Sequence, residues 1–319
     1  MAPRFCLAAG LLFCSSAALA QHYPEKSVLM TAPFSAGGSV DLVARAVAQQ
    51  MSETWKQPVV VANRPGASGN IGAETVARAA PDGYTLLMGT TALSSSPALY
   101  SRLGYDLMRD LTPVGLVVTM TNVLVVHPSL PARSVPELLK LAKARPGVLM
   151  SASASVGSSN HLALVLFNML SGSGIGHVPY KGAAPAVADV LGGHVDMTFV
   201  PIAAAVSPLR SGRLRALAVT AGKRSSALPD LPTVAEAGVP GYEAAGWNAL
   251  FAPGNTPRDI VAAINQALVE SLRASRVRDM LASSGADAAG STPEELAAFL
   301  RVETAKWSKV VHEAGIKAQ

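Results

Sequence analysis

The sequence predicts an α/β fold with two domains, and three observations lead to that prediction. Apolar runs with the character of buried strands alternate along the chain with segments of helical periodicity. A turn of small residues that leads from a strand into a helix occurs twice, at residues 34–41 and 153–161. The chain has 319 residues, and removal of a leader of 20 leaves 299, which is more than one typical core holds.

The first 20 residues are expected to be a secretory signal peptide. Arg4 is followed by an apolar run at residues 5–13 and then by small residues that end in Ala18-Leu19-Ala20. The apolar run is too short to span a bilayer. Both cysteines, Cys6 and Cys14, lie in this leader, so the remaining chain can form neither a disulfide nor a thiolate metal site. We therefore expect a soluble protein exported to the periplasm.

The charge pattern favours small anionic ligands and excludes nucleic acid. The whole chain has a net charge of +5, and because Arg4 carries one of these charges the exported part carries +4. Its lysines and arginines are scattered rather than clustered, and aromatic residues make up only 5% of the chain. A nucleic-acid surface would need a basic patch with interleaved aromatic residues.

The opening turn, Phe34-Ser35-Ala36-Gly37-Gly38-Ser39-Val40-Asp41, follows an apolar strand at residues 28–32 and begins a helix that runs to about residue 51. The two glycines permit backbone angles closed to other residues, and Ser39 is a good N-cap. The free N–H groups of the first helical turn suit a small anion. Two alternatives stay open, because many Gly-Gly turns bind nothing and Asp41 suits a cap as well as a ligand contact.

A second strand end is expected to contribute to the same site. The apolar residues 85–88 predict a buried strand that delivers Thr90 and Thr91 to its carboxyl end, where open α/β sheets place ligands. Their hydroxyl groups either bind a ligand or cap the next turn. Residues 114–126 are almost continuously apolar, and we interpret them as one long strand that crosses between the two domains.

The second half of the chain repeats the pattern of the opening segment, in which a strand leads through a turn of small residues into a helix. Ser134 and Glu137 predict a capping box, and a strand at residues 148–152 leads into the loop at residues 153–161. Two helix starts, one in each domain, then hold one small molecule between them. Asp196 lies in a following strand, either near the cleft or at an edge. A proline-rich segment at residues 229–240 is expected to return to the first domain, where capping threonines at 256 and 292 begin two terminal helices.

Signals for catalysis, metals and cofactors are missing from the sequence. It contains no G-x-S-x-G, Walker or H-E-x-x-H motif, and its six histidines are dispersed without metal-ligand spacing. We expect no metal and no cofactor. His161 falls in the first turn of the second helix, where a solvated or capping histidine is the commoner explanation. Ser158 with His161 would be the pair for an exported hydrolase or transferase, which is the enzymatic alternative.

The chain resembles the extracytoplasmic solute-binding proteins of tripartite tricarboxylate transporters, also called the Bug family, over essentially its whole length after the leader. The segments that carry this resemblance are Pro33-Phe34 with Gly37-Gly38 and Asp41, Asn63-Arg64-Pro65-Gly66 with Gly69-Asn70-Ile71-Gly72, Pro81-Asp82-Gly83-Tyr84-Thr85-Leu86, His161-Leu162, His177-Val178-Pro179-Tyr180-Lys181-Gly182, Val195-Asp196-Met197, Leu231-Pro232-Thr233-Val234-Ala235-Glu236-Ala237-Gly238, and Glu303 with Trp307. Each segment is weak alone, but their order and spacing are specific.

The resemblance implies a two-domain clamshell of the periplasmic binding-protein type (type II-like), with each domain a mixed sheet flanked by helices. The first domain would comprise residues 21–121 and 241–319, and the second residues 122–240. A small organic acid or related solute would bind in the cleft, largely through backbone groups and bridging waters. Carried over position by position, the contacts would come from Phe34, Ser35, Ala36, Gly37, Gly38, Ser39, Asp41, Thr90, Thr91, Ser153, Ser155, Ser158, His161 and Asp196.

The resemblance also implies a monomer that docks transiently to membrane transporter subunits, or alternatively a solute sensor that reports to a membrane receptor. Three positions depart from the family pattern: Ala36 replaces proline, Ser155 replaces glycine and Val165 replaces glutamate. Ser155 matters most, because its side chain takes the place of a bare backbone beside the expected ligand. The solute of a relative therefore does not transfer directly to this chain.

Overall fold

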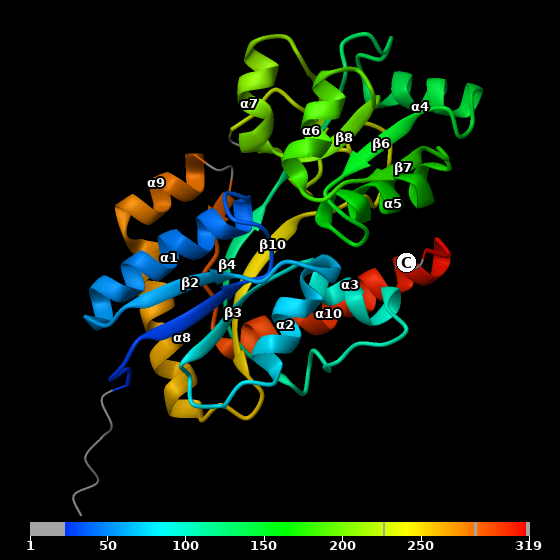
Figure 1. The fold of residues 1–319 in the computed structure, drawn as a ribbon. Coiled ribbons are helices and arrows are strands. Elements are labelled where there is room, and N and C mark those ends of the chain that lie inside the picture. Colours follow the sequence, from blue (N-terminus) through cyan, green and yellow to red (C-terminus); the bar gives the residue numbers. More distant parts are fainter. Residues whose placement is uncertain (1–22, 226, 284–285, 317–319) are drawn as a thin grey trace, which may run out of the picture.

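The computed structural model describes residues 23–225, 227–283 and 286–316, so the predicted signal peptide lies outside the described residues. Within these residues the strands form two sheets, and helices flank both (Figure 1). We call the first sheet with its helices the first lobe and the second sheet with its helices the second lobe. The α/β prediction is confirmed.

The first sheet has the strand order β11-β4-β10-β3-β1-β2. Its strands are β1 Val28–Ala32, β2 Val59–Asn63, β3 Thr85–Thr90, β4 Leu111–Met120, β10 Gly246–Pro253 and β11 Ala286–Ala288. Strands β2, β1 and β3 are parallel, whereas β10 pairs antiparallel with both β3 and β4. The helices of this lobe are α1 Ser39–Trp55, η1 Ala67–Gly69, α2 Asn70–Ala77, α3 Ala92–Leu99, α8 Arg258–Arg273, α9 Ser275–Ser283 and α10 Pro293–Glu313.

The second sheet has the strand order β7-β6-β8-β5-β9. Its strands are β5 Asn122–Val126, β6 Met150–Ser153, β7 Gly176–Pro179, β8 Met197–Pro201 and β9 Arg215–Val219. Strand β6 is parallel to β7 and β8, and β5 is antiparallel to β8 and β9. The helices are α4 Val135–Ala144, α5 Ser159–Ser171, α6 Ala183–Leu191 and α7 Ile202–Arg210.

Each sheet buries apolar side chains on both faces. In the first lobe, Met30 and Met88 pack with α1 and α8 on one face, and Leu87 and Phe251 pack with α2 and α10 on the other. In the second lobe, one face packs against α4 and α5 and the other against α6 and α7. Burial on both faces requires strands with continuous apolar runs, which is the pattern the sequence shows.

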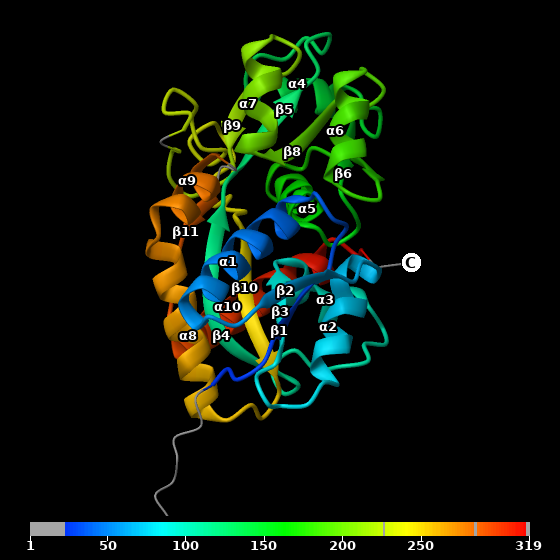
Figure 2. The same cartoon turned by 60° about the vertical axis from the view of Figure 1, so that its left-hand side comes forward.

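The two lobes are joined at a narrow waist (Figure 2). The apolar run 114–126 was expected to be one strand, but the chain breaks at Thr121 into β4 and β5, which belong to different sheets. The returning segment after β9 pairs with this crossing: the Asn122 amide donates to Thr220 Oγ1 at 3.0 Å, and the Thr220 amide donates to the Asn122 carbonyl at 2.9 Å. The domain boundaries expected from the sequence stay a prediction.

Helix α10 forms a further link between the lobes. It begins against the first sheet with Leu296 and Leu300, and it ends with Trp307, Val310 and Val311 in the core beneath the second sheet. Figure 1 shows its red end beside α5. No helix among the described residues is long and apolar enough to cross a bilayer.

Several helix starts differ in detail from the sequence expectation. The N-cap of α1 is Gly38 rather than Ser39, and the Gly37 amide is bound by Asp41 instead. Ser134 caps α4, but Glu137 accepts the amide of Arg133 rather than completing a capping box. At α10 the complete box of Thr292 and Glu295 is present. The short helices α3 and α7 were not expected.

Candidate ligand-binding site

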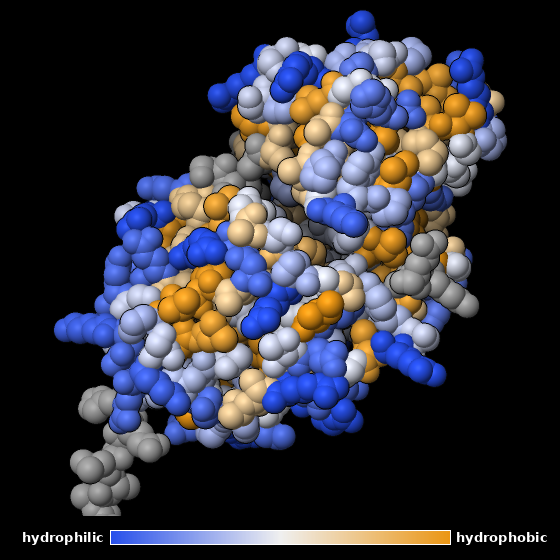
Figure 3. Space-filling view, viewed as in Figure 1, coloured by the Kyte–Doolittle hydropathy of each residue, from blue (hydrophilic) through white to orange (hydrophobic). Residues whose placement is uncertain are grey.

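The loops that follow the parallel strands of each sheet lie opposite one another. In the first lobe these loops follow β1, β2 and β3, and in the second lobe they follow β6 and β7, because carboxyl ends of parallel strands share one sheet edge. The two edges touch where Ser68 Oγ donates to the Val156 carbonyl at 2.7 Å. On the face drawn in Figure 3, the surface is hollowed along the line where the lobes meet.

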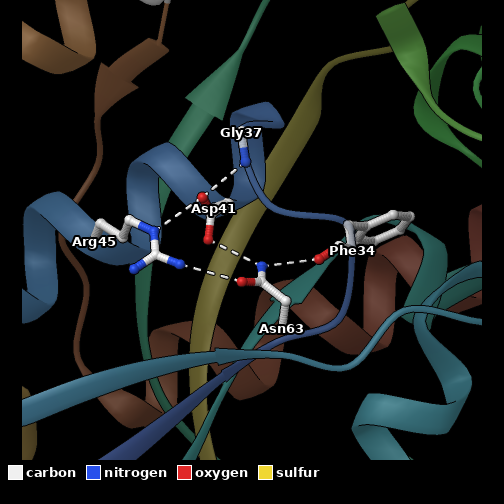
Figure 4. A network of polar contacts seen from close by, with 5 residues as sticks. All are labelled: Phe34, Gly37, Asp41, Arg45 and Asn63. Atoms are coloured by element: carbon white, nitrogen blue, oxygen red, sulfur yellow. Dashed lines mark hydrogen bonds and ion pairs between the residues drawn. The ribbon is translucent and has the colours of Figure 1, made fainter. Parts of the chain in front are cut away.

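The turn after β1 is held by a network centred on Asp41 (Figure 4). One oxygen of this buried carboxylate accepts the Gly37 amide at 2.9 Å and Arg45 Nε at 3.0 Å, and the other accepts Asn63 Nδ2 at 2.9 Å. Asn63 Nδ2 also donates to the Phe34 carbonyl at 3.0 Å. Burial alone raises the pKa of Asp41, but the bonds from Arg45, Gly37 and Asn63 outweigh it, so its pKa lies below the ordinary value.

The network leaves the rest of this turn exposed. Residues 35–39 are exposed, and Gly37 has a φ of +79°, which favours glycine. Within the described part of α1, the Leu42 amide donates back to the Gly38 carbonyl at 3.0 Å, so the amides of Ser39 and Val40 precede the helical ladder. Asp41 therefore shapes the turn, and the first-turn amides face outward at the positive end of the helix.

The sequence left open whether Thr90 and Thr91 bind a ligand or cap the next turn, and the two threonines differ in their surroundings. The Thr91 hydroxyl is buried and accepts the Trp247 amide at 2.9 Å, which ties the end of β3 to β10. Thr90 stays partly exposed, and its hydroxyl accepts the Ala92 amide at 3.3 Å. Thr91 is thus a structural link, and Thr90 is the threonine at the cleft edge.

The loop after β6 is built from serine hydroxyls. Ser158 Oγ donates to the Ser155 carbonyl at 2.6 Å and accepts the Ser155 amide at 3.3 Å, which closes the turn before α5. Ser153 Oγ donates to the same carbonyl at 3.1 Å and contacts His177 Nε2 at 2.6 Å. Because a hydroxyl has one proton, Ser153 Oγ donates to only one of these two partners at a time.

The buried His161 side chain holds this loop in place. Its Nδ1 accepts the Gly157 amide at 3.0 Å, and its ring stacks on that of His177 with centroids 3.9 Å apart. His161 is only 3% exposed. Burial, together with the neighbouring His177, lowers the pKa of His161 to about 3, and burial lowers that of His177 to about 4. Both rings are therefore neutral at physiological pH, as the accepting Nδ1 of His161 requires.

Asp196 does not join the other expected residues of the second lobe. The register pairs Val126 with Met197 and Asn122 with Pro201, so the start of β8 lies at the end of the sheet remote from the crossing. There Asp196 accepts the Met150 amide at 2.8 Å, at the beginning of β6, whereas Ser153 lies at the end of that strand. We therefore leave Asp196 out of the site proposed below.

The pair required by the enzymatic alternative is not formed. Ser158 Oγ is engaged with Ser155, and the accepting nitrogen of His161 is occupied by Gly157, so neither group activates the other. In the described part of the chain, no group of three or more His, Cys, Asp or Glu is placed to hold a metal ion.

Two further hollows lie away from the opening turn. One of about 1230 Å³ is formed in the first lobe between α8, α9 and β11. Another of about 500 Å³ lies between α5, β7 and the end of α10, and His161 and His177 form part of its wall. Neither hollow includes residues 34–41. We therefore locate the cleft from the hydrogen bond between the loops of the two lobes rather than from the volume of a hollow.

Sequence reasoning missed three residues that shape these loops: Asn63, Ser68 and His177. Asn63 and His177 stand in segments that carry the family resemblance, but neither they nor Ser68 was assigned to the site. Their partners lie 22 to 88 positions away along the chain. The Asn-Arg-Pro-Gly segment after β2 was the available signal, since its strand ends at the same sheet edge as β1.

Comparisons with known proteins agree with this geometry. The family described as "Tripartite tricarboxylate transporter family receptor" matches residues 43–316. Protein BugT of Bordetella pertussis is 39% identical over 300 residues, which cover 93% of this chain and 92% of that protein. The structure titled "R. palustris Rpa4515 with adipate" has a TM-score of 0.86 at 40% identity and covers 92% of this chain and 99% of that one.

A second solved structure, MatC (Rpa3494) from Rhodopseudomonas palustris with bound malate, has a TM-score of 0.83 at 35% identity and covers 91% of this chain and 100% of that one. These similarities confirm the clamshell fold class and the resemblance drawn from the sequence. They extend over both lobes rather than one. The chain therefore belongs to the tripartite tricarboxylate transporter receptor family, whose members are solute-binding receptors and not enzymes.

Proposed function

We propose that this protein captures a small organic carboxylate between its two lobes and presents it to a tripartite tricarboxylate-type transporter. The observations that carry this proposal are two helix-start loops, residues 34–41 in the first lobe and residues 153–161 in the second, and the contact between the lobes that Ser68, in the loop next to Phe34, makes with Val156 of the second loop. Neither loop contains lysine or arginine, so backbone amides, hydroxyls and helix dipoles supply the positive potential for the carboxylate.

The residues of these loops fall into two sets: those that we propose touch the ligand, and those that hold the loops in place. Proposed contacts in the first lobe are Phe34, Ser35, Ala36, Gly37, Gly38, Ser39 and Thr90, and in the second lobe Ser153, Ser155 and Ser158. Asp41, Thr91 and His161 act by fixing those segments, because their polar atoms are taken by backbone amides. This division matches a site in which amide donors are fixed before the anion arrives.

The chemistry of the related structures narrows the ligand class. Rpa4515 was solved with adipate and MatC with bound malate, and both of these acids are dicarboxylates. Two carboxylates suit two facing helix starts, one for each charged end. Ser155 adds a hydroxyl on the second-lobe loop, which favours a solute with a further polar substituent. We accordingly propose a dicarboxylate or a hydroxylated relative.

The same family membership supports further proposals on location and partners. The leader and the receptor family together support export to the periplasm after removal of residues 1–20. The family's role in transport supports the proposal that the protein docks to the membrane subunits of the transporter. We expect the receptor to act as a monomer.

Thermal unfolding tests the ligand proposal directly. The exported chain, refolded from denaturant to remove any carried ligand, is heated with adipate, malate, tricarboxylates, aromatic acids and amino acids. A ligand at one hundred times its dissociation constant stabilises the folded state by about 2.7 kcal/mol, which raises Tm by roughly 5 °C for a chain of this size. The diamide of adipic acid, which has the same length without charge, is expected to give no shift.

A variant pair locates the binding in the cleft. Ala36→Asp places a carboxylate within the exposed turn and is expected to abolish the shift, whereas Ala282→Asp on α9, also exposed, leaves it intact. Binding of an acid that survives Ala36→Asp unchanged would place the ligand elsewhere. Equal shifts from acids and their amides would exclude recognition of the carboxylate.

A further inference from the structure

Ser68 reaches from the first lobe into the second. It lies in the loop between β2 and α2, and its hydroxyl is 2.7 Å from the Val156 carbonyl in the turn before α5. The Tyr100 hydroxyl at the end of α3 donates to Ser68 Oγ at 3.2 Å, so the proton of Ser68 is directed towards Val156. Ser155 Oγ lies 3.5 Å from the same oxygen. A chain of hydroxyls therefore crosses between the lobes and ends on a proposed ligand loop.

The backbone at Ser68 is held in an unfavourable conformation. Ala67 has a φ of +46° and Ser68 a φ of +55°, in the left-handed region that favours glycine. The surrounding structure enforces these angles, because Asn70 Nδ2 donates to the Ala67 carbonyl at 2.8 Å and Tyr105 donates to Asn70 Oδ1 at 2.7 Å. Strain of this kind persists where its geometry is used. Here it presents a side-chain donor to the opposite lobe.

The turn that Ser68 contacts, residues 155–158, allows a close approach of the first lobe. Gly157 has a φ of +77°, which favours glycine, and a Cβ there would lie 2.5 Å from Leu99 Cδ1 of α3, so a larger residue would displace the Leu99 side chain. Its carbonyl is 3.4 Å from Ser95 Oγ, again on α3. The first lobe thus contacts the backbone of this turn at two successive carbonyls, those of Val156 and Gly157.

We propose that Ser68 is a positioning residue that holds the ligand loop of the second lobe when the lobes are closed. The Val156 carbonyl is within reach only when the two lobes are together, so the hydrogen bond stabilises the closed state selectively and slows release of the ligand. It also fixes the 155–158 turn, which leads into the first turn of α5. Because that turn is a ligand loop only under the proposed function, this role of Ser68 rests on that function.

Ser68→Ala is the central variant, and Thr75→Ala is its matched control. Thr75 lies on α2 close to Ser68 in sequence, and its hydroxyl donates to the Ile71 carbonyl at 2.8 Å within the same helix. Tyr100→Phe removes the donor that orients Ser68, so it is expected to produce a smaller effect of the same sign. Ser68→Gly removes the hydroxyl and also relieves the left-handed strain, so it separates loss of the contact from loss of stability.

Lobe closure is measured by distances between spin labels on the exported chain. The only cysteines lie at positions 6 and 14 in the leader, so Val60→Cys and Val148→Cys, at exposed sites in the first and second lobes, label uniquely. Ser68→Ala and Ser68→Gly are expected to shift the distribution towards longer distances, and Thr75→Ala is not. With malate and adipate as probes, both Ser68 variants release the acid about 3- to 10-fold faster, as loss of one hydrogen bond predicts. Ser68→Gly retains or raises Tm.

Three outcomes would overturn the role of Ser68. The first is that the wild type shows no population with the short label-to-label distance of closed lobes. The second is that the Ser68 variants show the same distances as Thr75→Ala. The third is that Ser68→Gly releases the acid faster only in proportion to a lowered Tm. If neither acid binds the wild type, the ligand proposal is weakened. The distances without added acid still decide whether Ser68 holds the lobes together.

Discussion

Asp41 shows how one buried carboxylate sets the shape of a loop that it does not itself present to the cleft. Three donors converge on it from three segments: the Gly37 amide from the turn, Arg45 from the next turn of α1, and Asn63 from the end of β2. Bonds to a charged acceptor are stronger than neutral ones. The turn after β1 is therefore fixed before any ligand arrives.

Asp41→Asn tests this role at the scale of the residue. Asparagine has the size of aspartate but no charge. One carboxylate oxygen becomes an NH2 group, which then faces one of the donors that bind Asp41. We expect the free energy of unfolding to fall by about 1–3 kcal/mol and acid binding to weaken. Urea unfolding and calorimetric titration measure the two effects. Asp259→Asn, at an exposed carboxylate in the first turn of α8, is the control.

The outcome that contradicts this role is unchanged acid affinity in a variant that is measurably less stable. Asp41 would then support the fold without shaping the loop. Unchanged stability together with unchanged affinity would remove Asp41 from both roles.

At the residue scale, the sequence predicted loops well and partners poorly. Gly37-Gly38 and the serine-rich loop identified the two turns because small residues before a helix have few other uses. By contrast, Asn63, one of the three partners of Asp41, is 22 positions away from it, and the Val156 partner of Ser68 is 88 positions away. The direction of Asp196 depends on the register of β8 against β5, which no local pattern encodes.

At the scale of the element, α10 is the helix that joins the two cores. Its Glu303, only 7% exposed, accepts the indole N–H of Trp247 at 3.1 Å and that of Trp307 at 2.8 Å. Trp247 belongs to a core of the first lobe and Trp307 to a core of the second. One carboxylate oxygen thus satisfies a buried donor on each side of the waist.

Glu303→Ala is expected to lower the free energy of unfolding by about 2–5 kcal/mol, because it leaves two buried indole donors without an acceptor. Glu303→Gln keeps a carbonyl oxygen at the same place and is expected to cost less. Urea unfolding followed by tryptophan fluorescence measures both. If the two variants lose the same amount, charge rather than hydrogen bonding to the indoles stabilises this site.

Sequence periodicity predicted the long elements better than their ends. The stripe of Ile264 and Leu268 predicted α8, and Thr292 with Glu295 predicted the start of α10. The break at Thr121 was missed because both β4 and β5 are apolar, so the run continues through the point where the chain changes sheets. Which sheet a strand joins is decided by packing across the waist.

At the scale of the whole molecule, the two stacked histidines make stability depend on pH. The ordinary pKa of histidine, 6.5, falls to about 3 for His161 and about 4 for His177 on folding. A lowered pKa means that the unfolded chain binds protons that the folded chain does not. The contribution of the pair is therefore complete above pH 6.5 and is lost as the pH falls from 6.5 towards 4 for His177 and towards 3 for His161.

Between pH 6 and pH 4, neutral His161 is expected to cost about 1.4 kcal/mol of stability per pH unit, and the more exposed His177 is expected to cost less. The double variant His161→Asn with His177→Gln keeps an acceptor for the Gly157 amide and a hydrogen-bonding partner for Ser153, but neither side chain can be charged in this range. Its urea midpoint should fall less steeply on acidification. Equal slopes in the two proteins would show that carboxylates alone cause the acid sensitivity.

The path of α10 has a consequence for how far the lobes can separate. Two strand crossings alone would permit a wide swing, but the last turns of α10 sit in the second core while its first turns sit on the first sheet. Opening must therefore bend this helix or draw Val310 and Val311 along the core that receives them. We therefore expect the C-terminal helix to limit how far the lobes separate, and with it the width of the opening through which a solute enters.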